Sequence, residues 1–180
     1  MMPNLRALGR FAARAVAAYR RSAGSRAPLG RAPEGVRPRP SGTRPGRPSR
    51  PYPGDWTGPV HPVHRPRPDG EPDPGEVVWT WVPYQEDHRR GKDRPVLVVD
   101  RHGEHLLCLM LTSRDRSGDL AARADYLDVG TGPWDRRGRA SEVKLDRVLQ
   151  VLPADVRREG AVLPAERFRQ VAEELRRRRG

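Results

Sequence analysis

The chain has 180 residues, a formal net charge of +12 and a single cysteine, Cys108. One cysteine excludes a disulfide framework and fits a reducing cytoplasm, and the five scattered histidines form no His/Cys cluster with metal-ligand spacing, so we expect neither a metal nor another cofactor. Because no apolar run is long enough for a transmembrane helix or a secretory signal, we expect no membrane span and no export.

The first 72 residues differ in composition from the rest. They hold 14 Arg, no Lys, 4 acidic residues and 14 of the 20 prolines, so they carry 14 − 4 = +10 of the net charge. Few apolar residues fall between positions 27 and 72, and such a stretch cannot bury enough surface to offset its ordering entropy. We therefore predict a disordered, basic, proline-rich segment over 1–72 and one domain over 73–180.

This segment has several interpretations. Residues 4–21 place apolar side chains near one helical face with arginines around them, which is typical of a short amphipathic helix at a surface. An arm that binds phosphates without specificity, or one that is merely solvated, is favoured over a dedicated function. A start codon assigned too far upstream would also produce such a leader.

Residues 73–180 show the periodicity of a small β-domain. Apolar residues alternate, or run in short stretches bounded by Gly, Asp and Arg, which predicts strands at about 76–82, 95–100, 105–112, 125–129, 141–144 and 147–151. Trp79 and Trp81 alternate with Thr80, so we expect both indoles to face one side and to build the core or a dimer surface.

A helix is expected from Pro164 onward. Proline suits the first turn, and apolar residues follow with the spacing i, i+3, i+4, i+7 at Phe168, Val171, Ala172 and Leu175. Arginines 176–179 close the helix, where cations meet the C-terminal dipole. A solvated helix end is favoured there over a contact with RNA.

Polar groups that suit phosphate chemistry stand at the ends of the predicted strands. Arg94 begins a strand after the polar loop 84–93, and its planar guanidinium offers paired donors to two phosphate oxygens. Thr112 and Ser113 end the third strand, before a second polar loop at 114–124, with hydroxyls that can bond a phosphate oxygen. Loops on a rigid barrel are where function usually lies.

Each of these residues also has a purely structural interpretation. Arg94 can pair with Asp93 or Glu86, and the Thr-Ser pair can simply end a strand. Trp134, in a glycine-rich basic loop, and Tyr84, after a proline, suit base stacking. Packing against the barrel or a second subunit is the slightly favoured alternative for Trp134.

Three ordered motifs carry a resemblance to a known family. They are GE-x-x-W-x-x-x-P from Gly75, G-x-x-RP-x-L-V-V from Gly91, and L-T-S at 111–113. Their order resembles the MazF/PemK toxins of type II toxin–antitoxin modules over about Pro74 to Arg179. The resemblance implies a mainly β fold, an SH3-like β-barrel with a C-terminal helix, usually a homodimer, that cleaves single-stranded RNA without a metal and is blocked by a cognate acidic antitoxin.

The resemblance also implies roles for residues. The arginine of the family's RP pair is its main catalytic residue, which corresponds to Arg94, and Thr112 and Ser113 match the T-S pair. Many members carry Glu five residues before this arginine, where this chain has Arg89. Some use a histidine six residues before it, as His88 is here, and imidazole titrates near neutrality. Glu86 and Asp87 are alternatives for the base, and a bystander histidine is equally expected.

Cations and one further acid complete the predicted site. In the segment 141–147, Lys144 stands where relatives carry a cation and Asp146 where PemK-like members carry an acid; a solvated strand residue and a turn acceptor are their structural alternatives. Together with Lys144, the cations Arg89 and Lys92 of the first loop are expected to bind RNA phosphates.

The resulting hypothesis is a metal-independent, sequence-selective, cytoplasmic endoribonuclease, the toxin of a toxin–antitoxin module. A non-catalytic barrel that binds RNA or protein is the competing hypothesis, favoured somewhat by the departure at Arg89. A plain protein-interaction barrel is a third.

Overall fold

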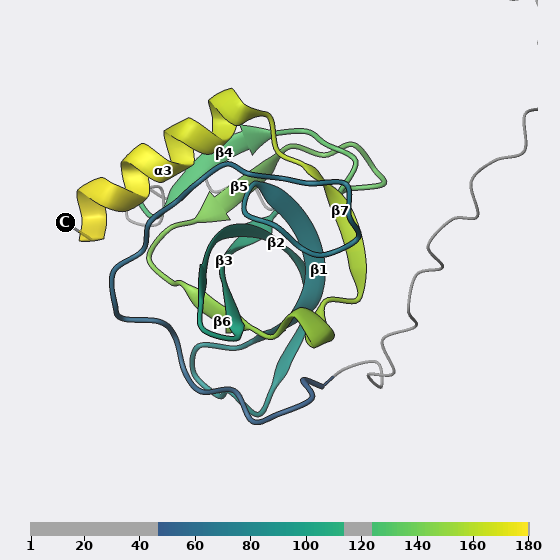
Figure 1. The fold of residues 1–180 in the computed structure, drawn as a ribbon, viewed down its shortest axis with the longest axis vertical. Coiled ribbons are helices and arrows are strands. Elements are labelled where there is room, and N and C mark those ends of the chain that lie inside the picture. The colour runs from purple at the N-terminus through teal and green to yellow at the C-terminus, as the bar shows by residue number, and fades with distance from the viewer. Residues whose placement is uncertain (1–46, 114–123, 180) are drawn as a thin grey trace, which may run out of the picture. The chain divides into compact units, whose positions relative to one another are not determined.

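The computed structural model describes residues 47–113 and 124–179, which form a curled antiparallel sheet and one C-terminal helix (Figure 1). The predicted helix at 4–21 and nearly all of the second polar loop lie outside these residues. In chain order the elements are β1 (Glu76–Pro83), β2 (Gly91–His102), β3 (His105–Thr112), β4 (Tyr126–Gly130), β5 (Ser141–Lys144), β6 (Leu149–Val151), the short 3-10 helix η1 (Pro153–Asp155), β7 (Arg158–Val162) and α3 (Ala165–Arg179).

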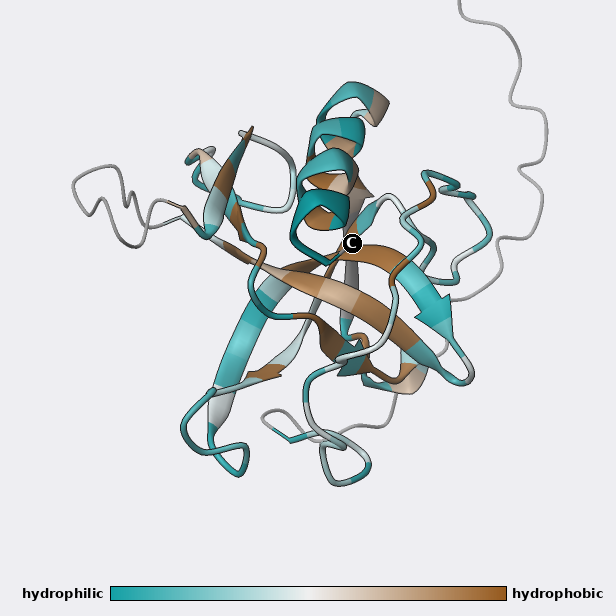
Figure 2. Cartoon of the chain, turned by 90° about the vertical axis from the view of Figure 1, so that its left-hand side faces the viewer, coloured by the Kyte–Doolittle hydropathy of each residue, from teal (hydrophilic) through white to brown (hydrophobic). Residues whose placement is uncertain are grey.

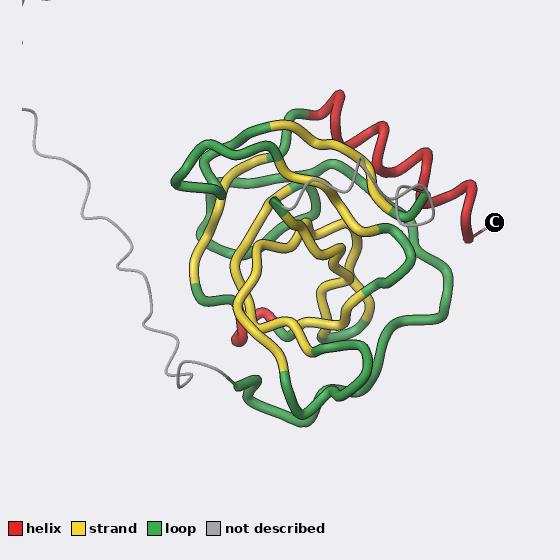
Figure 3. The backbone as a smooth tube through the Cα atoms, turned by 180° about the vertical axis from the view of Figure 1, so that it is seen from behind, coloured by secondary structure: helices red, strands yellow, loops and turns green. Residues whose placement is uncertain are grey.

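The sheet has the strand order β4-β5-β3-β2-β1-β7, and β6 pairs with β3. All of these pairings are antiparallel. Seen from behind, the strands curl into a ring with α3 on its outside (Figure 3). The fold is therefore the predicted one, an SH3-like β-barrel with a C-terminal helix.

Both faces of the central strands are buried. Alternate residues of β2 point to opposite faces, so Leu97 and Val99 join one apolar cluster while Val96 and Val98 join another. The first cluster includes the predicted stripe of α3, Phe168, Val171, Ala172 and Leu175, and the colours of Figure 2 show that the helix turns its hydrophobic side to the sheet.

All six predicted strands are found. Those at 105–112 and 141–144 have the predicted ends, the other four have shifted ends, and β7 is an additional strand. β2 begins at Gly91, so Arg94 is its fourth residue and not its first, and the connecting loop is shorter than expected. β7 has the sequence REGAV, which lacks strand periodicity, and it forms because its backbone pairs with the edge of β1. Tertiary pairing overrides local propensity in such short edge strands.

Residues 47–72 correct the prediction of disorder. They form an extended strap along the outside of the ring, drawn in dark blue in Figure 1. Trp56 and Val60 pack against the first apolar cluster and Tyr52 against the second. The strap is also tied by its backbone, because Trp56 N donates to Val148 O at 2.8 Å and Val63 N donates to Val99 O at 3.3 Å.

The strap is ordered because its few apolar residues are spaced to meet the barrel. Its prolines also restrict the unfolded chain, so less entropy is lost on docking. The α3 arginines contribute, since Arg176 donates to Pro62 O at 3.3 Å and Arg179 to Gly58 O at 3.2 Å. These helix-end arginines therefore bind strap carbonyls, a role that neither sequence interpretation included.

A buried ion pair links the strap to the barrel. Arg147, 8% exposed, donates through Nε to Asp55 Oδ2 at 2.6 Å and through a second nitrogen to Pro83 O at 2.9 Å. Tyr52 donates its hydroxyl to Asp55 Oδ1 at 2.5 Å. Although burial alone would raise it, the pKa of Asp55 lies below its ordinary value because Arg147 and Tyr52 hydrogen-bond the carboxylate.

Candidate functional site

A pocket opens where strands β2 and β3 separate. The two strands pair as far as Val96 and Met110, after which β3 pairs with β5 through Leu111 and Thr112. The first part of β2 pairs with β1 alone, so a gap is left at this fork. The gap encloses about 580 Å³ and is lined by residues of β1, β2, β3 and the 131–141 segment, namely Trp79, Lys92, Asp93, Arg94, Pro95, Leu111, Thr112, Ser113, Trp134, Asp135, Arg139 and Ser141.

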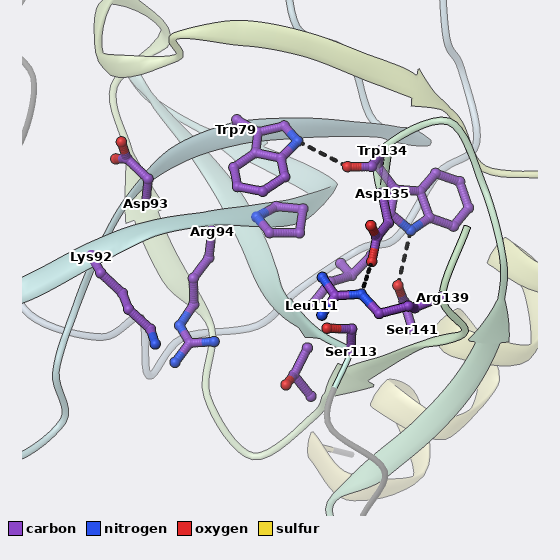
Figure 4. A pocket seen from close by; sticks show the side chains of 12 residues that line it. Trp79, Lys92, Asp93, Arg94, Leu111, Ser113, Trp134, Asp135, Arg139 and Ser141 are labelled. Carbon is purple, nitrogen blue, oxygen red and sulfur yellow. Dashed lines mark hydrogen bonds and ion pairs between the residues drawn. The ribbon is translucent and has the colours of Figure 1, made fainter. Parts of the chain in front are cut away.

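Alternation along β2 sorts the charges of this pocket. Figure 4 shows the side chains of Lys92 and Arg94 extending from one side of the strand and Asp93 from the other. Asp93 Oδ2 pairs with Arg157 at 2.9 Å, so its charge is balanced from β7's side of the sheet. Arg94 itself is half-buried. The two cations therefore reach the pocket together.

The opposite wall carries a second charged pair. Arg139 Nε donates to Asp135 Oδ2 at 2.8 Å, and the Asp135 side chain is only 11% exposed. The backbone N–H of Arg137, with a smaller contribution from Arg139, holds the pKa of Asp135 below its ordinary value. Asp135 is therefore ionised at neutral pH and tied to its arginine.

Two tryptophans, Trp79 and Trp134, line the pocket. Trp79 Nε1 donates to Trp134 O at 3.2 Å, and Trp134 Nε1 donates to Ser141 Oγ at 3.1 Å. Trp134 is 3% exposed and belongs to the first apolar cluster. The Trp134 ring therefore packs into the barrel, as its slightly favoured alternative has it, and base stacking by this residue stays a prediction.

Five of the predicted residues line this pocket, namely Arg94, Thr112, Ser113, Lys92 and Trp134. Thr112, 8% exposed, and Ser113 come to it from the end of β3. Thr80, which lies on β1 and pairs with Arg94, is also buried and donates its hydroxyl to Asp155 O at 3.1 Å. The polar residue between the two tryptophans is thus part of the fold and not of the surface.

The other predicted residues lie elsewhere. His88 and Arg89 line a second pocket, beside the strap. Lys144 and Asp146 pair with each other at 2.8 Å, and Lys144 also donates to Gln85 at 3.4 Å. Tyr84 lines neither of these two pockets, and the Arg90 guanidinium lies 6.0 Å from its ring.

Sequence analysis missed Asp135 and Arg139 as pocket residues. Their i, i+4 spacing within a glycine-rich basic loop was a weak signal, because nothing in the loop indicates which strand it approaches. The alternation of Trp79 predicts a place in the core or on a dimer surface, and its position at the fork follows only from the parting of β2 and β3.

The pocket can hold an anion by chemistry that this chain supplies itself. Lys92, Arg94 and Arg139 bring three cations, and Thr112 and Ser113 bring hydroxyls that both donate and accept. Among the described residues, no three His, Cys, Asp or Glu side chains gather where they could hold a metal ion. Over the same residues, no helix is both long and apolar enough to cross a bilayer.

Comparison with known proteins gives one family match and several similar folds. A family model described as "PemK-like, MazF-like toxin of type II toxin-antitoxin system" matches residues 73–178. A chain of a MazE–MazF crystal structure from Deinococcus radiodurans is 23% identical with a TM-score of 0.43, over 59% of this chain and 94% of that one. The toxin MazF-mt6 of Mycobacterium tuberculosis is 20% identical with a TM-score of 0.40, over 56% and 91%.

No curated protein sequence matches the chain significantly. The family match spans more than half of the chain, from the residues just before β1 to the end of α3. The chain therefore belongs to the PemK-like, MazF-like toxin family of type II toxin–antitoxin systems.

Proposed function

We propose that the protein is a metal-independent endoribonuclease that cuts single-stranded RNA at selected sequences, as the toxin of a toxin–antitoxin module. The observation that carries the proposal is the meeting of Arg94, Thr112 and Ser113 in the pocket at the fork, within the residues that match the toxin family. These groups suit a phosphodiester, since a guanidinium and two hydroxyls donate to its oxygens.

The reaction follows from what these groups stabilise. The ribose 2′ oxygen attacks the adjacent phosphorus and gives up its proton to a base. The bond from phosphorus to the 5′ oxygen then breaks, and that oxygen takes a proton. The products are a 2′,3′-cyclic phosphate and a 5′ hydroxyl. Arg94 stabilises the negative charge that grows on the phosphorane, while Thr112 and Ser113 hold its oxygens.

Two residues are candidates for proton transfer. They are His88 and Asp146, both found from sequence, and neither lines the pocket. Asp146 forms an ion pair with Lys144 at 2.8 Å. The proposed mechanism therefore depends on Arg94 and the hydroxyl pair, and it assigns to His88 and Asp146 no more than a proton-transfer step that their removal would slow.

The partners follow from the family and the charge. As the toxin of a type II module, the protein would be blocked by a cognate protein antitoxin of acidic character, which suits a chain with a net charge of +12. We further propose that the protein is a cytoplasmic homodimer, because members of the family are usually homodimers and a chain with one cysteine fits a reducing compartment. Sedimentation of the purified chain measures whether it is a dimer.

The test uses the full chain with EDTA present on a long single-stranded RNA, with cut positions mapped and product ends identified. Arg94→Ala is compared with Arg101→Ala, which removes an arginine from the other end of the same strand. We expect discrete cuts with cyclic phosphate ends, lost in Arg94→Ala and kept in Arg101→Ala.

Two results would overturn the proposal. Cutting that survives Arg94→Ala would remove the assigned mechanism. RNA that stays intact with the unaltered chain, beside measurable binding, would favour a non-catalytic module instead, and the displacement of His88 from the Arg94 pocket is the observation that favours this second candidate.

A further inference from the structure

A second pocket lies between the strap and the loop that joins β1 to β2. It encloses about 480 Å³, within the range of small-ligand sites. The strap forms one side through residues 47–52, and Trp81, His88 and Arg89 form the other. The strap lies before the part of the chain that matches the toxin family, so this pocket is not a feature of the family domain alone.

The charge of the second pocket is of one sign. Arg47, Arg50 and Arg89 line it together with His88, and no Asp or Glu is among its lining residues. Arg50 pairs with Glu104 at 2.8 Å and Arg89 with Asp87 at 3.2 Å, but these arginine side chains are 63% and 92% exposed. Exposed pairs of this kind contribute little stability, so a phosphate can replace either carboxylate at small cost.

Aromatic rings give the second pocket its faces. The rings of Tyr52 and His88 lie 5.0 Å apart, nearly perpendicular at 89°. Tyr52 is held by its hydrogen bond to Asp55. Trp81 is held by close backbone, because a side chain at Gly91 would come within 2.6 Å of the indole and 2.3 Å of Val82 O. The Tyr52 and Trp81 rings are therefore positioned before any ligand arrives.

We propose that this second pocket binds one nucleotide of a single-stranded RNA, with its base against the Tyr52 and His88 rings and its phosphate on Arg47 and Arg89. The inference rests on the proposed function for its ligand. Cations beside aromatic rings are the combination that holds single strands, and an acidic peptide would leave the ring faces unused.

The two pockets are close enough to share one strand. Trp79 lines the pocket at the fork and Trp81 lines the second one, and residues two apart on a strand share a face with a separation of about 6.6 Å. An RNA chain that places its scissile phosphate at Arg94 would thus extend to the second pocket beside the strap. In this arrangement His88 contacts the flanking nucleotide, and this role replaces the proton-transfer role considered for it above.

Binding is measured apart from cutting, with a 5′-fluorescein, 2′-O-methyl RNA 12-mer of mixed sequence that has no free 2′ hydroxyl at any position. The full chain is compared with the double variant Arg47→Gln/Arg89→Gln, and with the control Arg65→Gln/Arg136→Gln, which removes the same charge at exposed positions outside both pockets. Fluorescence anisotropy is recorded over a series of salt concentrations.

We expect the pocket variant to bind at least about fivefold more weakly than the control. The slope of log K against log salt should be shallower than the control's by about 0.7 for each RNA phosphate that the variant no longer neutralises. His88→Ala should weaken binding about fivefold or more, and His88→Phe, which keeps an aromatic ring but no imidazole nitrogens, should restore it. With a cleavable RNA, the effect of Arg47→Gln/Arg89→Gln should appear in KM more than in kcat.

Equal affinity of the pocket and control variants would overturn this proposal. So would tighter binding of a labelled oligoglutamate peptide than of the RNA, abolished in the pocket variant alone, since that would make the pocket a protein site. Because the 12-mer cannot be cut, these results stand whether or not the unaltered chain cleaves RNA, and an inactive chain would count only against the proposed function.

Discussion

Arg94 shows what a single side chain contributes at the fork. It is half-buried on β2 and enters a pocket with Lys92 and two hydroxyls. Arg94→Lys keeps the charge but loses the planar guanidinium that can bind two oxygens. We therefore expect kcat to fall about 10- to 100-fold, against about 1000-fold for Arg94→Ala. Single-turnover cleavage of a labelled RNA measures both. A Lys variant as active as the unaltered chain would contradict the bidentate role.

Trp134 provides a prediction that separates packing from recognition. The ring is buried and its indole N–H is bonded to Ser141. We expect Trp134→Ala to lower the free energy of unfolding by about 3–5 kcal/mol because it leaves a large cavity. Urea denaturation measures this change. Unchanged stability together with weaker RNA binding would restore the stacking interpretation that the buried ring argues against.

At the scale of elements, the strap is part of the folded domain. It buries Trp56, Val60 and Tyr52 against the barrel and receives bonds from α3. Removing residues 1–46 should leave the melting temperature within a few degrees. Removing 1–72 should lower stability by about 4–6 kcal/mol, at about 2 kcal/mol for each of three partly buried side chains. Calorimetry on the two truncated chains decides between a strap and a dispensable tail, and equal stability would contradict the strap.

The Asp55–Arg147 pair gives the strap a dependence on pH. The pKa of Asp55 is lower in the folded chain than its ordinary 3.8, so the unfolded state binds more protons and stability rises with pH. The contribution is complete above pH 3.8 and is lost as the pH falls through the lower, folded value. Asp55→Asn should cost about 2 kcal/mol at neutral pH and progressively less in acid, as measured by urea unfolding at several pH values. A cost that does not change with pH would show that the charge is irrelevant.

For the whole molecule, charge is distributed unevenly. Residues 1–46 hold 10 Arg and one acid, which is +9 of the net +12. We expect their removal to weaken binding to RNA of any sequence and to flatten its salt dependence, while the cut positions stay the same. Binding and cut mapping on the shortened chain test this. New cut positions would mean that residues 1–46 take part in selecting the RNA sequence.

Much of the fold was predictable because it follows from local hydrophobic periodicity. The alternation in β1 to β3 and the stripe of α3 each depend on residues a few positions apart, and the strands and helix form where these patterns lie. Arg94, Thr112 and Ser113 were predicted from short motifs, the RP and T-S pairs, whose order resembles that of a known family. Such signals survive without knowledge of what the segment packs against.

Other features could not be read in this way. The strap has a composition typical of disorder, and it is ordered by contacts with residues about 40 to 120 positions away in sequence. Trp134 looks like an exposed loop aromatic until the barrel closes over it. His88 has the right spacing from Arg94 along the chain, but the turn of the loop carries it toward Tyr52 and away from the fork.

By itself, the amino-acid sequence determined the family, the strand and helix segments and the basic character of the N-terminal part. It also predicted the residues Arg94, Thr112 and Ser113 for the site. The tertiary structure alone decided that residues 47–72 belong to the folded domain, that Asp135 and Arg139 face Arg94 across one pocket, and that His88 belongs to another. The reason is physical: local periodicity encodes which face of an element is apolar, whereas the meeting of distant side chains depends on how the sheet curls and where its strands part.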